Sequence, residues 1–101
     1  EGMFQLRKIA ALAEGAHKLF IPHTWCNGIS LYANLQLAAS LPNCPWFEYP
    51  YEEPGWGHEA SHILFKNPFK FENGYVKVPQ TPGLGFEIDE ELVNSFIVKD
   101  I

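Results

Sequence analysis

Apolar residues recur at helical spacing in two stretches of the chain, from residue 3 to about residue 16 and from residue 29 to residue 41. In the first stretch the residues that share one face are Leu6, Ile9, Ala10 and Ala13, and in the second they are Leu31, Leu35, Ala38 and Ala39. A repeat near 3.6 residues is typical of amphipathic helices. We therefore predict two helices in the N-terminal half of the chain.

Each predicted helix is followed by a short apolar run that predicts a buried strand. Residues 18–22 follow the first helix and end at a proline, and residues 44–49 follow the second. His23 comes directly after the first run, and Glu48 lies near the end of the second. A β/α barrel presents its catalytic groups in this way, from the C-terminal ends of its strands. The pattern predicts βα units of an α/β fold and favours an enzyme.

The C-terminal half has a different pattern, in which turn signals separate short apolar runs. Prolines and glycines between residues 50 and 57 indicate a long irregular loop. The pair Asn73-Gly74 lies between apolar residues 69–71 and 75–78 and predicts a β-hairpin. Residues 82–85 predict a turn, and Asp89 is a candidate cap for a short helix over residues 90–96. The phenylalanines expected in the core are Phe65, Phe69, Phe71 and Phe86.

Composition narrows the class of protein and of partner. The chain has 101 residues, of which 47% are hydrophobic and 15% aromatic, enough for one packed core. Its net charge of -5 and only 7 scattered Lys and Arg residues argue against nucleic acid as a partner. It has neither a membrane-length apolar run nor a signal-peptide pattern, so we expect a soluble cytoplasmic protein with no membrane partner. We expect Cys26 and Cys44 to be reduced thiols.

Two parallel βα units supply only two adjacent strands. A parallel sheet needs neighbouring strands and helices on both faces before it is stable. We therefore expect the chain to be the end of a larger fold.

The order and spacing of several motifs carry a family resemblance over nearly the whole chain. The motifs are Arg7–Glu14, Ile21-Pro22-His23, Leu37–Asn43, Phe47-Glu48-Tyr49-Pro50, Gly74–Pro79 and Pro82–Asp89. With these motifs the chain resembles the C-terminal part of enolase-superfamily proteins of the mandelate racemase and muconate lactonizing enzyme group. The resemblance implies that residues 1–50 form the last βα units of a TIM-type barrel. It also implies that residues 51–101 form a loop, hairpin and short helix that pack on a capping domain outside this chain.

The resemblance also implies site residues and a cofactor. His23 matches the histidine after the seventh barrel strand, and Glu48 matches the glutamate after the eighth. Family chemistry begins with abstraction of a proton next to a carboxylate, and a Mg²⁺ ion holds the resulting enediolate. The Mg²⁺ ligands of the family lie on the third, fourth and fifth strands, so no metal ligand is assigned in this chain. The aspartate partner of the histidine is likewise expected upstream of Glu1.

The chemistry of these side chains agrees with the implied roles. Histidine titrates near neutral pH, so His23 is a candidate for either acid or base. Glu48 is a candidate hydrogen-bonding partner for a substrate carboxylate or its enediolate, and it must be protonated if it donates. The structural alternatives are a histidine that caps a loop and a surface glutamate. Because Glu48 follows Trp46-Phe47 in a buried pattern, and unpaired buried charge is costly, we favour the functional interpretation.

The residues around His23 resemble the acid-sugar dehydratases of the group more than mandelate racemase. In those enzymes the histidine is thought to protonate the departing 3-hydroxyl. We therefore expect dehydration of a sugar acid to a 2-keto-3-deoxy acid, in a homo-oligomer. Racemisation, epimerisation and cycloisomerisation are the near alternatives. Trp25 and Tyr49 are the candidate substrate-binding residues, although aromatic packing is the commoner use of such side chains.

The segment His58-Glu59-Ala60-Ser61-His62 fits the HExxH pattern of zinc hydrolases. It lies between Pro54 and Pro68, follows poor helix formers, and has no third ligand at a defensible spacing. The alternative is a short polar helix in the loop after the last strand. A non-catalytic interaction module that associates through exposed sheet edges is the remaining alternative.

Overall fold

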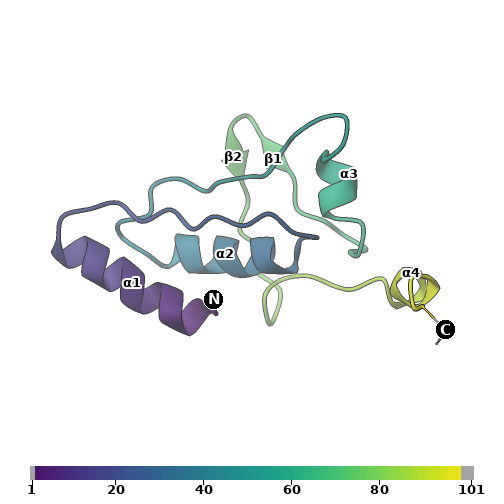
Figure 1. Ribbon diagram of the computed structural model, residues 1–101, viewed down its shortest axis with the longest axis horizontal. Coiled ribbons are helices and arrows are strands. Elements are labelled where there is room, and N and C mark those ends of the chain that lie inside the picture. The colour runs from purple at the N-terminus through teal and green to yellow at the C-terminus, as the bar shows by residue number, and fades with distance from the viewer. Residues whose placement is uncertain (1, 99–101) are drawn as a thin grey trace.

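The computed structural model describes residues 2–98, and its two longest helices confirm the two helical predictions. They are α1 (Met3–Gly15) and α2 (Ile29–Ala39), which end one and two residues earlier than expected. The helices pack side by side in the N-terminal half (Figure 1). Helix α2 buries six of its residues, whereas α1 buries Ala10 alone. Helix α2 is therefore the centre of the fold. None of the helices within residues 2–98 is long and apolar enough to span a membrane.

The C-terminal half contains α3 (His58–Ser61), β1 (Phe71–Glu72), β2 (Tyr75–Val76) and α4 (Glu90–Ser95). The antiparallel pairing of β1 with β2 confirms the predicted hairpin, although its strands are shorter than expected. Asn73 and Gly74 at its tip have φ angles of 51° and 79°, as a type I′ turn requires. The carboxylate of Asp89 accepts a hydrogen bond from the Leu92 N–H group at 3.1 Å, which confirms the predicted helix cap.

The two predicted parallel strands are the main difference between expectation and structure. Residues 18–22 and 44–49 are extended and run along the same side of α2 (Figure 1). Within residues 2–98, however, no backbone hydrogen bond joins the two segments, although the Phe20 N–H group donates to the carbonyl of Asn43, the residue just before the second segment, at 3.0 Å. A parallel pair becomes a sheet only when a ladder of such bonds and further strands support it. Within residues 2–98 the two segments are therefore extended without forming a sheet, and the predicted strands are not observed there.

The core lies between α2 and the segment that links α3 to β1. It consists of Leu31, Tyr32, Leu35, Phe65 and Phe69, with partly buried residues such as Phe86 packed against it. Tyr32 is fully buried, and its ring meets three phenylalanine rings edge-on, with centroids 4.7 to 5.1 Å away. The core predictions for Phe65 and Phe69 are confirmed.

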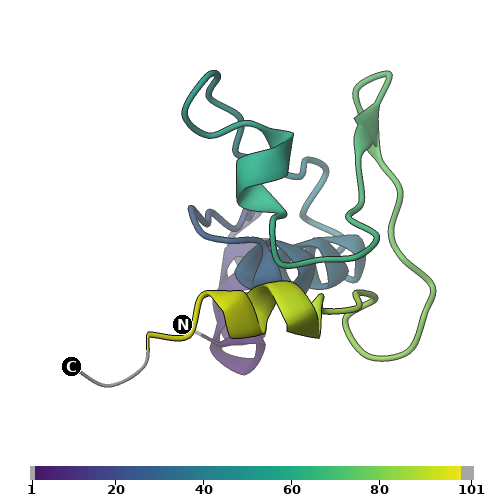
Figure 2. The ribbon, with the colours of Figure 1, turned by 90° about the vertical axis from the view of Figure 1, so that its right-hand side faces the viewer.

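Phe71 is not a core residue, because it is 46% exposed. It lies in β1, and the hairpin projects from the body of the molecule at the end of two long arms (Figure 2). The apolar sequence of the hairpin therefore did not reveal which of its phenylalanines is buried.

Gly28 lets the loop after His23 approach α3 closely. Its φ of 89° lies in the region that favours glycine, and it caps the N-terminus of α2. A Cβ atom at this position would overlap the ring of Phe65 and lie 2.8 Å from the carbonyl oxygen of Ser61. The glycine thus brings two segments together that are more than thirty residues apart in the sequence.

Candidate functional site

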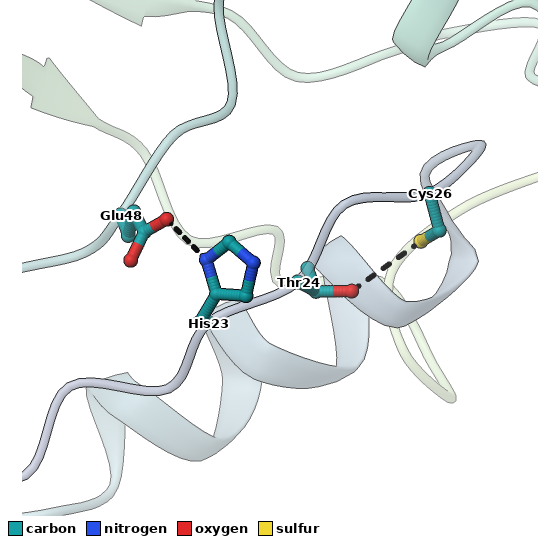
Figure 3. Close-up of polar contacts among 4 residues, drawn as sticks. All are labelled: His23, Thr24, Cys26 and Glu48. Carbon is teal, nitrogen blue, oxygen red and sulfur yellow. Dashed lines mark hydrogen bonds and ion pairs between the residues drawn. The ribbon is translucent and has the colours of Figure 1, made fainter.

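His23 and Glu48 lie together in the structure, although 25 residues separate them in the sequence. His23 directly follows the first extended segment and Glu48 lies in the second, and their side chains point toward one another (Figure 3). The Nδ1 atom of His23 is 2.5 Å from the Oε1 atom of Glu48. A carboxylate at this distance fixes the orientation of the imidazole ring. The arrangement is suited to moving a proton to or from a bound molecule.

Both side chains of the pair are open to solvent in the described part of the chain. The exposed fraction is 65% for the His23 side chain and 43% for that of Glu48. The burial that we expected around Glu48 was therefore wrong, and Trp46 is 69% exposed. In residues 44–49, Phe47 and Tyr49 pack against the core, whereas Trp46 and Glu48 point the other way and are exposed. Because Glu48 contacts Nδ1, Nε2 is the ring nitrogen of His23 that remains available to a ligand.

Trp25 lies two residues after His23, and it stacks on an aromatic ring from another loop. The centroids of Trp25 and Trp56 are 5.8 Å apart, with 26° between the ring planes. Trp25 remains 49% exposed, so part of its ring is free to contact another molecule. The sequence marked Trp25 as a candidate but did not predict the partner, since no local pattern links it to the loop of Trp56.

Tyr49 faces a different environment from Glu48, the residue before it. Its hydroxyl lies 2.5 Å from the Nδ1 atom of His58, and its ring stacks on the rings of His58 and His62. Burial raises the pKa of Tyr49 to about 12, so the phenol keeps its proton at neutral pH. The structure therefore joins Tyr49 to the loop that contains α3.

The loop after His23 also contains a thiol. The Thr24 hydroxyl donates to the Cys26 sulfur at 3.5 Å (Figure 3). Burial raises the pKa of the Cys26 thiol, but hydrogen bonds from Thr24, Ser30 and nearby backbone outweigh that effect and lower the pKa. Cys26 and Cys44 are both free, in agreement with the expectation of unpaired thiols.

The HExxH segment forms α3, a helix of four residues, as the short-helix alternative predicted. The rings of His58 and His62 stack with centroids 4.5 Å apart. Their Nδ1 atoms are occupied, that of His58 by Tyr49 and that of His62 by the Ser61 hydroxyl at 2.8 Å. Residues 2–98 contain no group of three or more His, Cys, Asp or Glu side chains placed to hold a metal ion. This geometry does not favour the zinc-hydrolase alternative.

Comparison with known proteins identifies the family. Residues 1–92 match the family described as "Enolase C-terminal domain-like". The chain belongs to this family. Its relatives include sugar-acid dehydratases and proteins of the mandelate racemase and muconate lactonizing enzyme group, so the resemblance found in the sequence is confirmed.

Two curated relatives show the range of reactions within this enolase-type family. Arabinonate dehydratase from Saccharolobus solfataricus is 33% identical over 98 residues, which cover 97% of this chain and 25% of the relative. D-galactarolactone cycloisomerase from Agrobacterium fabrum is 32% identical over 104 residues, which cover 98% of this chain and 27% of the relative. The chain thus spans about a quarter of the length of these enzymes.

A solved structure shows the same fold. It is a mandelate racemase/muconate lactonizing enzyme-like protein from Roseovarius sp. TM1035, which superposes with a TM-score of 0.76 at 33% identity. The match covers 93% of this chain and 22% of that protein. The described helices and hairpin therefore have the fold of an enolase-superfamily C-terminal domain.

Proposed function

We propose that the full-length protein is an enolase-superfamily enzyme that dehydrates a sugar acid to a 2-keto-3-deoxy acid. The observation that supports this most directly is the contact between His23 and Glu48, which joins two titratable side chains on the exposed side of the extended segments. The similarity to arabinonate dehydratase supports the reaction and the substrate class.

In the proposed reaction a general base, which we expect outside the described residues, takes the proton from the carbon next to the substrate carboxylate. The 3-hydroxyl then leaves as water, taking a proton from the Nε2 atom of His23. The enol that results rearranges to the 2-keto acid. His23 is the general acid of this step, since imidazolium is a competent donor near neutral pH. Glu48 orients His23 through Nδ1, and in its protonated form it donates a hydrogen bond to a substrate oxygen or to the enediolate.

Two further predictions from the sequence belong to the same proposal. Trp25 forms part of the substrate-pocket wall, which agrees with its position two residues after His23 and its half-exposed ring. Residues 1–50 supply the last βα units of a barrel, and residues 51–101 pack on a capping domain. We also retain the expectations of a cytoplasmic homo-oligomer.

The family implies a Mg²⁺ ion, and we identify no ligands for it among the described residues. No group of three or more His, Cys, Asp or Glu side chains converges within residues 2–98. We therefore assign no metal ligand here, and expect those ligands elsewhere in the full-length protein.

Cycloisomerisation or racemisation is the second candidate function. D-galactarolactone cycloisomerase is nearly as similar to this chain as arabinonate dehydratase, at 32% against 33% identity. In that case His23 would exchange a proton with carbon rather than protonate a leaving hydroxyl. The same pair of side chains would serve, because both reactions pass through an enediolate.

The test is to incubate the full-length protein with arabinonate, other five- and six-carbon sugar acids, and D-galactarolactone. Formation of a 2-keto acid from an aldonate supports dehydration, and the His23→Asn variant should not form it. Conversion of the lactone, or inversion at carbon 2 without loss of water, would support the second candidate. Absence of all these products would contradict both.

A further inference from the structure

Tyr49 is held by both histidines of the HExxH segment, a motif that the proposed function does not otherwise use. Its hydroxyl contacts His58, and its ring lies nearly parallel to those of His58 and His62, with interplanar angles of 9° and 16°. The two imidazole rings also stack on one another. Tyr49, His58 and His62 therefore form one stacked cluster.

The side chains of this cluster are uncharged at neutral pH. Burial raises the pKa of Tyr49 and lowers that of His58, where nearby Lys70 acts in the same sense and Glu59 opposes it. At neutral pH both groups are therefore uncharged, and we assign the hydrogen bond as one from the Tyr49 hydroxyl to Nδ1 of His58, with the ring proton on Nε2. Burial and the neighbouring His58 lower the pKa of His62 to about 4, so this ring is neutral too.

The cluster rests on the core of the molecule. The ring of His62 meets that of Phe69 edge-on at 4.9 Å, and the side of Tyr49 meets the same ring at 5.9 Å. Phe69 is in turn fixed to α2, because its N–H group donates to the buried Tyr32 hydroxyl at 3.1 Å. His62 is only 2% exposed. Tyr49 is thus anchored to the best-packed part of the fold.

Glu48 is the residue next to Tyr49. Successive side chains of an extended segment point to opposite sides, and consecutive Cα atoms are about 3.8 Å apart. Glu48 accordingly faces His23 while Tyr49 faces the stacked cluster. Whatever fixes Tyr49 also fixes the backbone from which the Glu48 carboxylate reaches His23.

We propose that Tyr49 and His58 are positioning residues that hold Glu48 in register with His23 through the Tyr49 hydroxyl and the Nδ1 atom of His58. This inference rests on the proposed catalytic roles of His23 and Glu48. It replaces the expected substrate contact of Tyr49 with an indirect role. It also gives the HExxH segment a function that needs no metal ion.

The first test uses the full-length protein labelled with ¹⁵N in its histidine rings. His23→Asn and His58→Asn identify the two sets of ring resonances. In the Tyr49→Phe variant, which loses only the hydroxyl, both sets should shift, since the contact to His58 is lost and the Glu48–His23 contact is loosened. The matched control is Tyr51→Phe, because Tyr51 is 52% exposed and the described residues offer its hydroxyl no hydrogen bond. Unchanged His23 resonances in Tyr49→Phe would overturn the proposal.

The second test measures kinetics on the substrate found for the full-length protein. Tyr49→Phe and His58→Leu should each lower kcat by about tenfold and leave KM within about twofold, because the alignment of Glu48 matters in the transition state. The double variant should be no worse than either single variant, since both remove the same hydrogen bond. His58→Asn should restore most of the activity, because its side-chain oxygen can accept from the Tyr49 hydroxyl as Nδ1 does. A rise in KM alone would instead show that Tyr49 contacts the substrate.

The two proposals fail in different ways. If His23→Asn and Glu48→Gln leave turnover intact, the catalytic assignment is wrong, whatever Tyr49→Phe does. If those two variants are inactive while Tyr49→Phe behaves as the wild type in both tests, the catalytic assignment stands and the positioning role is wrong. The resonance test needs no substrate, so it decides the positioning role even if no substrate is found.

Discussion

Glu48 and Tyr49 are consecutive residues, and each places an oxygen 2.5 Å from the Nδ1 atom of a histidine. The contact of Glu48 with His23 is open to solvent, whereas the contact of Tyr49 with His58 lies among stacked aromatic rings. An exposed ion pair contributes at most about 1 kcal/mol to stability, but it stays accessible to a ligand. A cluster of packed rings contributes to stability mainly through its many close contacts. One extended segment therefore connects a region available for chemistry with a region that provides rigidity.

The largest difference between the two regions should appear when His23 is changed. His23→Asn in the full-length protein should lower turnover by about a thousandfold, because a general acid is lost. The melting temperature should hardly change, since the side chain is exposed. Turnover assays and thermal unfolding of the same preparation check both halves of this prediction. Retained activity would contradict the catalytic role.

Removal of an aromatic ring from the core should have the opposite effect, a large loss of stability. Phe65→Ala should lower the free energy of unfolding by about 3 to 5 kcal/mol, because Phe65 is 6% exposed and fills the space between Tyr32 and Phe86. Phe71→Ala is the matched control and should cost much less, since Phe71 is 46% exposed. Denaturant unfolding of both variants measures the difference. Equal losses would mean that the hairpin is as well packed as the core.

Replacing the Glu48 carboxylate with an amide should lower activity without lowering stability. Glu48→Gln keeps the shape of the side chain and should lower kcat by about a hundredfold through loss of transition-state stabilisation, with little change in KM. Stability should be unaffected, as for His23→Asn. Steady-state kinetics on the identified substrate provide the measurement. A parallel loss in kcat and in substrate affinity would instead indicate a role in positioning the substrate.

Lowering the pH should destabilise the folded chain through His62, which is buried beside Tyr49. His62 has a pKa of about 4 in the folded chain against an ordinary value of 6.5, so above pH 6.5 it adds no pH dependence. Between pH 6.5 and pH 4 the unfolded chain takes up the proton and the folded chain does not. Stability should therefore fall with pH, by at most about 1.4 kcal/mol per pH unit from this group, and level off below pH 4.

The His62→Phe variant tests this pH dependence. Its ring fills the same space without titrating, so the slope between pH 6.5 and pH 4 should be shallower than in the wild type. Unfolding midpoints measured across that range supply the comparison. An unchanged slope would assign the acid sensitivity to other groups.

Local patterns predicted the elements that depend on local interactions. The two long helices, the turn at Asn73-Gly74 and the cap at Asp89 follow from spacing and from the conformational preferences of single residues. The two predicted strands failed because a strand depends on neighbours that are distant in sequence. The predictions that Glu48 and Phe71 are buried were wrong for a related reason. An apolar neighbour in the sequence does not determine which residues cover a side chain in the folded chain.

For the candidate site, the sequence alone determined the identities of His23 and Glu48, their places after apolar runs, and the family to which the chain belongs. Only the tertiary structure decided that their side chains meet, that Trp25 stacks on Trp56, and that Tyr49 lies on the two histidines of the HExxH segment. The physical reason is the range of the interactions concerned. Helix periodicity and turn preferences act over a few residues, whereas each of these contacts requires two segments to pack against α2 or the aromatic core, which no short stretch of sequence specifies.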